Sequence, residues 1–138
     1  MARFRSLMAA AVGGMAGSFA RWGAVAAVAE QWADLTVFGL NVVGSLLLGL
    51  LLGQRDRLAD EQFALIGVGF AGGLTTFSNF AVAVASRLES GELLSASAYG
   101  VFTLGATLIA AGLGYRLSMA VAIRTMSRQA RTSVRGRS

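Results

Sequence analysis

The sequence predicts an all-α membrane protein with four transmembrane helices. Of its 138 residues, 55% are hydrophobic and only 14% are charged, and the mean hydropathy is +0.63. A soluble domain carries roughly a quarter of its residues as Asp, Glu, Lys and Arg. Because a spanning helix needs about 20 apolar residues, four spans with short loops fill most of the chain. No room is left for a separate soluble catalytic domain.

The four spans follow from the long uncharged intervals of the sequence. Arg21 interrupts the first interval, and clusters of charged residues bound the other three. The predicted spans cover residues 7–29, 35–54, 62–86 and 93–115. They form a transmembrane domain over residues 1–124, and residues 125–138 form an Arg-rich C-terminal tail.

The first span has an alternative interpretation as a signal peptide, because Arg3 and Arg5 precede a run of small apolar residues. However, Gly13, Gly17 and Arg21 recur at intervals of four residues and share one helix face. Small residues on one face are typical of packed membrane helices, since lipid gives helices no hydrophobic drive to associate. The spacing therefore favours a transmembrane helix.

The third span is predicted to be broken near the centre of the membrane. Gly72 and Gly73 lie close to its midpoint and are followed by the polar run 75–80, TTFSNF. Irregular backbone at that depth is tolerated only where it is buried in protein or lines a cavity, and the ends of broken helices are where transport proteins bind ions. The alternative is a continuous helix whose hydroxyls bond to carbonyls one turn back.

The residue types that are missing exclude most chemistry. The chain has no Cys, His or Pro, and all 12 basic residues are Arg, so thiolate, imidazole and lysine chemistry are excluded. All seven carboxylates lie in predicted loops, whereas a proton-coupled exporter normally needs an acid inside the membrane. A small four-helix multidrug-type exporter is therefore disfavoured. A non-transporting membrane subunit is the other alternative, and it would need neither the break nor internal polar residues.

The polar residues inside the spans suit a small anion. Arg21 is the single intramembrane charge, and its burial costs about 2.5–3.5 kcal/mol on insertion scales, so it is either functional or reaches the interface. Neutral hydrogen-bond donors replace the water around an anion without repelling it. Ring edges, which carry partial positive charge, are a further source of contacts, although aromatic pairs also arise from packing. The candidates are Asn41 and Ser45 on the second span, Thr75, Thr76, Phe77, Ser78, Asn79 and Phe80 at the break, and Tyr99, Thr103 and Thr107 on the fourth span.

Three stretches carry a resemblance to a known family. They are residues 13–21 (GGMAGSFAR), 41–45 (NVVGS) and 69–80 (GFAGGLTTFSNF). In this order, on the first three spans, they resemble the Fluc (CrcB) family of bacterial fluoride channels. The resemblance extends over nearly the whole chain.

This resemblance implies a passive fluoride channel of the bacterial inner membrane, with several spans per chain. It implies an antiparallel dimer and a structural sodium ion that is not transported, held by the backbone carbonyls of Gly72 and Thr75. It also implies site residues: Phe77 and Phe80 line the pore, Asn41 is a polar pore residue, Ser78 lies near the ion path and Arg21 near the vestibule. Asn79 departs from the family pattern, which often has Thr there.

The distribution of charge predicts an orientation. With four spans, both termini share a side with the loop at 55–61, which places ten arginines there (3, 5, 55, 57, 116, 124, 128, 131, 135 and 137) against Arg87 on the other side. The positive-inside rule then favours cytoplasmic termini. A homodimer inserted in both orientations should have little bias, so this bias favours a heterodimer with a paralogous chain of opposite bias. A second copy of the same chain is the alternative partner.

The C-terminal tail has two interpretations, which the sequence favours about equally. Its arginines at 124, 128, 131 and 135 share one helix face, as in a helix lying on anionic lipid. A solvated, disordered tail is the alternative. Because no aromatic residue accompanies the arginines, nucleic-acid binding is not expected.

Overall fold

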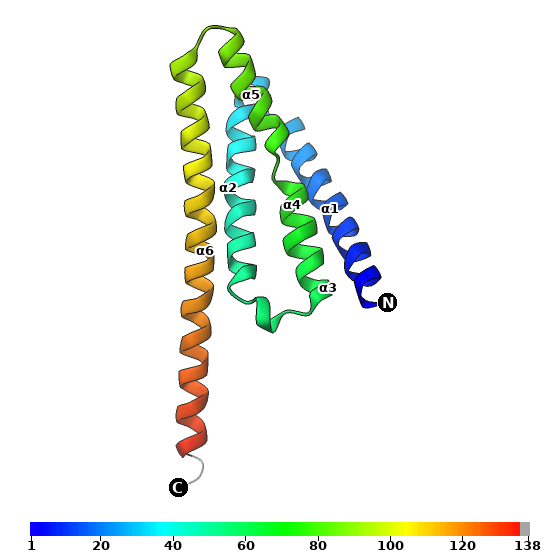
Figure 1. Ribbon diagram of the computed structural model, residues 1–138, viewed down its shortest axis with the longest axis vertical. Coiled ribbons are helices and arrows are strands. Elements are labelled where there is room, and N and C mark those ends of the chain that lie inside the picture. Colours follow the sequence, from blue (N-terminus) through cyan, green and yellow to red (C-terminus); the bar gives the residue numbers. More distant parts are fainter. Residues whose placement is uncertain (136–138) are drawn as a thin grey trace.

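The computed structural model describes the backbone of residues 1–135 and the side chains of residues 1–123. Within these residues the chain is all-helical and passes along the molecule four times (Figure 1). The N-terminus and the turn between α2 and α3 lie toward one end, and the turn between α5 and α6 lies at the other. The elements are α1 (Ala2–Ala26), η1 (Glu30–Trp32), α2 (Ala33–Leu52), η2 (Arg55–Arg57), α3 (Asp60–Phe63), η3 (Ala64–Ala71), α4 (Gly72–Leu74), α5 (Phe77–Glu89) and α6 (Leu93–Arg135).

Three helical stretches among the described residues are long and apolar enough to cross a membrane. They are Glu30–Leu52, Asp60–Glu89 and Leu93–Ile123, and they contain most of the second, third and fourth predicted spans. The first predicted span lies mostly in α1, whose 25 residues are enough for a crossing. Because α1 contains three arginines, it is less apolar than the other three stretches, and its mean hydropathy is too low for it to count among the membrane-length apolar helices.

The helix ends follow local rules. The side-chain carbonyl of Gln62 accepts a hydrogen bond from the Ala59 N–H (3.1 Å) where α3 begins. The turn from α5 to α6 contains Gly91 with φ of +76°, a left-handed conformation in which glycine is favoured after a helix. The last helix is longer than the predicted span, because α6 continues to Arg135. The side chains of the predicted lipid-contacting arginines lie outside the described residues.

The third membrane segment is bent, as predicted, but the break lies later than the two glycines. Gly72 is helical, with φ of −65° and ψ of −37°. Thr75 (φ −80°, ψ 152°) and Thr76 (φ −145°, ψ 125°) are extended and separate α4 from α5. β-Branched residues adopt extended backbone readily, and Thr76 can then cap the next helix. The continuous helix that was the alternative is therefore wrong.

The glycines serve close packing of helix backbones. α1 packs against η3 and α4, and α2 packs against α6. A Cβ atom on Gly13 would overlap the carbonyl of Leu65, and one on Gly73 would overlap the carbonyl of Gly14. In the same way, Gly49 of α2 leaves room for the Ala111 carbonyl of α6. Glycines on α1, α2 and α4 therefore let the segments pack backbone to backbone, and Gly13 is one that the sequence predicts as a helix contact.

We expect Gly49→Ala to lower the stability of the folded chain by about 1–3 kcal/mol, because the new methyl group forces the backbones of α2 and α6 apart. Gly39→Ala is the matched control on the same helix, since no atom lies within 4 Å of its Cβ position. Thermal unfolding in detergent, followed by circular dichroism, measures both variants. A melting temperature that is equally low for the two would contradict the packing role.

Candidate ion pathway

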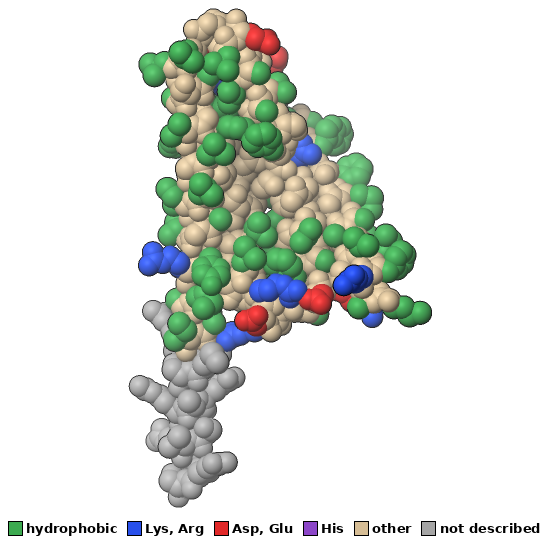
Figure 2. Space-filling view, in the orientation of Figure 1, with side chains coloured by type: hydrophobic (Ala, Val, Ile, Leu, Met, Phe, Trp, Pro, Cys, Tyr) green, Lys and Arg blue, Asp and Glu red, His purple; other side chains and the backbone are tan. Residues whose placement is uncertain are grey.

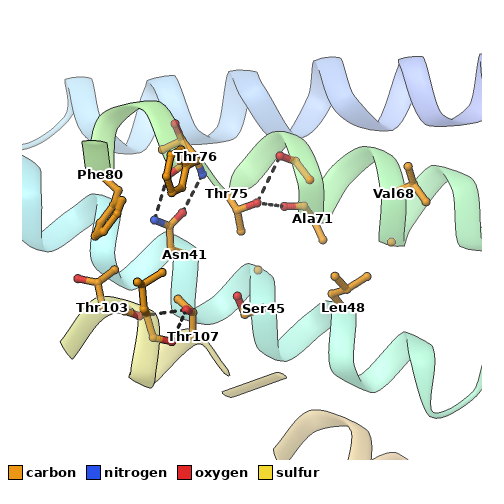
Figure 3. Close-up of a pocket in the computed structure, with 15 residues that line it drawn as sticks. Asn41, Ser45, Leu48, Val68, Ala71, Thr75, Thr76, Phe80, Thr103 and Thr107 are labelled. Atoms are coloured by element: carbon orange, nitrogen blue, oxygen red, sulfur yellow. Dashed lines mark hydrogen bonds between the residues drawn. The ribbon is translucent and has the colours of Figure 1, made fainter. Parts of the chain in front are cut away.

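A cavity of about 400 Å³ lies beside the break, between α2, the bent segment and α6 (Figure 3). It brings together Asn41, Phe77, Phe80, Gly72 and Thr75 from the predicted site. Its other lining residues are Gly44, Ser45, Leu48, Gly67, Val68, Ala71, Thr76, Thr103, Leu104 and Thr107. Of the three candidates on the fourth span, Thr103 and Thr107 therefore face the polar residues of the second span, and Tyr99 does not line this cavity.

Asn41 is buried in α2 and bonds to both backbone groups of Thr76. Its amide nitrogen donates to the Thr76 carbonyl (3.2 Å), and its side-chain oxygen accepts from the Thr76 N–H (2.8 Å), as the dashed lines in Figure 3 show. Thr76 directly precedes α5, so its C=O accepts the first bond of that helix, but its N–H has no partner within the helix. Asn41 supplies the partner for the N–H and a second bond to the C=O, so it holds the break in place as well as lining the cavity.

Threonine hydroxyls satisfy other groups at the break. The Thr75 hydroxyl donates to the carbonyls of Ala71 (3.0 Å) and Gly72 (3.3 Å). These carbonyls lie near the end of the first half-helix, the part of the bent segment before the break that ends with α4. The Thr76 hydroxyl caps α5 by accepting from the Asn79 N–H (3.4 Å) and lies 2.9 Å from the Ser78 hydroxyl. Ser78 therefore belongs to the first turn of α5. It does not line the cavity between α2, the bent segment and α6, which is called the main cavity below.

Arg21 lies apart from the other predicted site residues. Its Nε donates to the carbonyl of Gly73 (3.2 Å), near the end of the first half-helix, where a cation is favoured. It lines a second cavity of about 660 Å³ together with Ser18, Trp22 and Asn79, and Asn41 does not line that cavity. Arg21 thus has a partner inside the protein, but it contacts the break from the α1 side.

The two phenylalanines differ in their surroundings. Phe80 is 9% exposed, whereas Phe77 is 73% exposed, although their ring centroids are only 5.5 Å apart. Phe80 also stacks against Tyr99 of α6, with 5.9 Å between centroids. The cavity is therefore closed by protein at Phe80 and open at Phe77.

The cavity offers hydrogen-bond donors and no carboxylate. No acidic residue is among its lining residues, and Thr103, which is 3% exposed, has a hydroxyl without a hydrogen-bond partner among the described residues. Figure 2 shows charged side chains gathered near the end of the molecule that holds the α2–α3 turn, below a largely apolar face. Ion pairs there join Arg5 to Glu61 (3.0 Å) and Arg55 to Asp60.

One charged cluster has no signal in the sequence pattern. Asp34, predicted to lie in a loop, is in the first turn of α2. Its Oδ2 pairs with Nη2 of Arg87 on α5 at 2.6 Å. The two residues are 53 positions apart in the chain, so no helical spacing links them, and only the packing of α2 against α5 brings them together.

The fold and this cavity define a small helical membrane protein with a polar, carboxylate-free site at a broken helix. The sequence model of the family described as CrcB-like protein, Camphor Resistance (CrcB), matches residues 8–115. The chain therefore belongs to the CrcB family.

Several relatives carry the name fluoride-specific ion channel FluC 2. The one from Rhodococcus jostii (strain RHA1) is 45% identical over 84 residues, covering 61% of this chain and 72% of the relative. The one from Synechococcus sp. (strain CC9902) is 37% identical over 116 residues, covering 84% and 81%. The one from Natronomonas pharaonis is 37% identical over 114 residues, covering 83% and 95%.

We expect Asn41→Ala to loosen the break, because it leaves the buried N–H of Thr76 without a partner, at about 1–3 kcal/mol, and removes one of the bonds to the Thr76 C=O. Ser45→Ala, one turn along the same helix and on the same cavity, is the matched control. Hydrogen–deuterium exchange of the Thr76 amide should accelerate in Asn41→Ala and stay unchanged in Ser45→Ala. Equal exchange in both variants would show that Asn41 does not hold the break.

Proposed function

We propose that this chain is a fluoride-specific ion channel that lets fluoride leave the cell passively across the plasma membrane. The observation that carries the proposal is the carboxylate-free cavity at the break of the bent helix, in a chain whose relatives are named fluoride-specific ion channels. Members of such a family are multi-pass membrane proteins and not enzymes.

In this proposal the ion path follows the main cavity. Hydroxyl groups and amide N–H groups replace the water around fluoride, as polar pore linings do in other channels. The Thr103 hydroxyl, which lines the cavity, is one such donor, and the second amide proton of Asn41 is another, since Thr76 uses one. Phe77 and Phe80 present ring edges, whose partial positive charge suits an anion.

Arg21 and Ser78 have indirect roles in the proposed path. Arg21 places a positive charge on the opposite side of the break, where its bond to the Gly73 carbonyl fixes it. Ser78 supports the cap of α5 through the Thr76 hydroxyl, so it orients the helix that carries both phenylalanines.

We propose that a second chain completes the channel as an antiparallel dimer. Phe77 is largely exposed beside a buried Phe80, and no atom lies within 4 Å of the Cβ position of Gly72. Both residues line the main cavity, so the chain leaves that side of the site without a wall. A second chain would cover this open side of the cavity. Within each chain, α1 would be the fourth membrane crossing, and lipid would surround the outer faces of the dimer.

The carbonyls of Gly72 and Thr75 would hold the structural sodium ion. Carbonyl oxygens at the end of a half-helix are the groups that bind sodium in broken transport helices. The described residues contain no group of three or more Asp, Glu, His or Cys side chains that could hold a metal ion. The sodium would supply positive charge at the contact between two chains and would not be transported.

We expect liposomes that contain the channel, reconstituted from this chain and, for a heterodimer, its paralogous partner, to release fluoride and to retain chloride, as measured with ion-selective electrodes. Release should depend on sodium. Replacing Phe77 or Phe80 by Ile should slow it at least about tenfold while the protein stays folded, and Phe4→Leu, on the exposed start of α1, is the control. Variants of Phe77 and Phe80 that conduct like the parent would exclude a pore role for the rings.

The orientation of the chain distinguishes a homodimer from a heterodimer. Ten arginines on one side against one on the other favour a single orientation with cytoplasmic termini, and the partner would then be a paralogous chain of opposite orientation. A reporter fused to the C-terminus should be found on the cytoplasmic side only. Equal populations on the two sides would instead favour a homodimer of identical chains.

A further inference from the structure

A cluster of three side chains connects the surface end of α5 to the wall of the main cavity. Arg87 is held at two points: Nη2 pairs with Oδ2 of Asp34 (2.6 Å), and Nη1 donates to the carbonyl of Ala83 (2.7 Å). Its guanidinium carbon lies 4.6 Å from the centroid of the Tyr99 ring. With both ends of the guanidinium fork engaged, the cation has little freedom to leave that ring.

Tyr99 connects Arg87 to Phe80, which lines the main cavity. Its ring stacks against Phe80 at 5.9 Å, with an angle of 22° between the planes. Phe80 in turn lies 5.5 Å from Phe77. Phe80 is 9% exposed and close-packed. A displacement of Tyr99 would therefore take away a ring against which Phe80 packs, and Phe80 would no longer be held in the cavity wall.

We propose that Arg87, anchored by Asp34, is a positioning residue that holds Tyr99 and, through it, Phe80 in the orientation used for fluoride passage. The inference rests on the proposed channel function. Arg87 acts here through a cation–π contact and not by binding fluoride, since its charge is already paired with Asp34. Asp34 is the anchor, and its side chain is 48% exposed against 25% for Arg87.

The competing explanation is that Arg87 attracts fluoride to the mouth of the channel by its charge. The two explanations differ in their dependence on salt. Attraction at a distance is screened at high ionic strength, where the Debye length falls to roughly 3 Å at 1 M. A contact between packed side chains is much less affected, so a positioning role persists in high salt.

The first test is a double-mutant cycle on fluoride efflux from liposomes. We expect Arg87→Gln to slow efflux about tenfold, at both low and high ionic strength. In a Tyr99→Leu background, where the ring is gone, the same change should alter efflux less than about twofold. Asp34→Asn should slow efflux less than Arg87→Gln, and should have no further effect when combined with it. Arg3→Gln, which removes the same charge at the N-terminus, is the control and should conduct like the parent.

The second test does not depend on conduction. The chain contains only two tyrosines, Tyr99 and Tyr115, so incorporated 3-fluorotyrosine gives two resonances in a fluorine NMR spectrum. Arg87→Gln should shift or broaden the Tyr99 resonance and leave that of Tyr115 in place. Arg3→Gln should change neither. If the channel reconstituted with its partner released no fluoride while the Tyr99 resonance still responded, the channel function would be wrong and the positioning contact right.

Three results would overturn the proposal. The first is an unchanged Tyr99 resonance in Arg87→Gln. The second is an effect of Arg87→Gln on efflux that is the same with and without the Tyr99 ring. The third is an effect that disappears at high ionic strength, which would assign Arg87 to the attraction of fluoride.

Discussion

The pairing of backbone groups at the break of the third membrane segment is the constraint on which the other features of the site depend. In a membrane, an unpaired N–H or C=O has no water to bond with. Asn41 takes both groups of Thr76, and Arg21 takes the carbonyl of Gly73. α1 and α2 therefore both contribute a side chain to the break, and the break is stable only where these helices meet it.

Those contacts require helix backbones to approach closely. A Cβ atom on Gly44 would overlap the methyl group of Thr75, and one on Gly17 would overlap the carbonyl of Phe70. The glycines that let the helices pack thus also bring Asn41 and Arg21 within hydrogen-bonding distance of the bent segment. Packing and site geometry have the same origin in this chain, since larger residues at these positions would separate the donors from their acceptors.

The arrangement of charge fits the passage of a small anion. The arginines near the pathway each have a partner, the Gly73 carbonyl for Arg21 and Asp34 for Arg87. The main cavity has no acidic residue among its lining and presents hydroxyls, one amide and aromatic rings. An anion leaving water would meet hydrogen-bond donors that are individually weak and spread along the path, which suits conduction better than tight binding.

Composition and residue spacing are enough to predict the helical membrane class, the second to fourth spans, the presence of a break and the polar residues that face one cavity. These depend on composition and on spacing within one helix, which the order of residues contains directly. The position of the break at Thr75 and Thr76, and not at the two glycines, depends on helix packing, because the bonds from Asn41 that hold it come from another helix. Helix packing alone also separates Arg21 from the main cavity and joins Asp34 to Arg87. Contacts between residues 35 to 53 positions apart follow no helical period and exist only once the helices are packed.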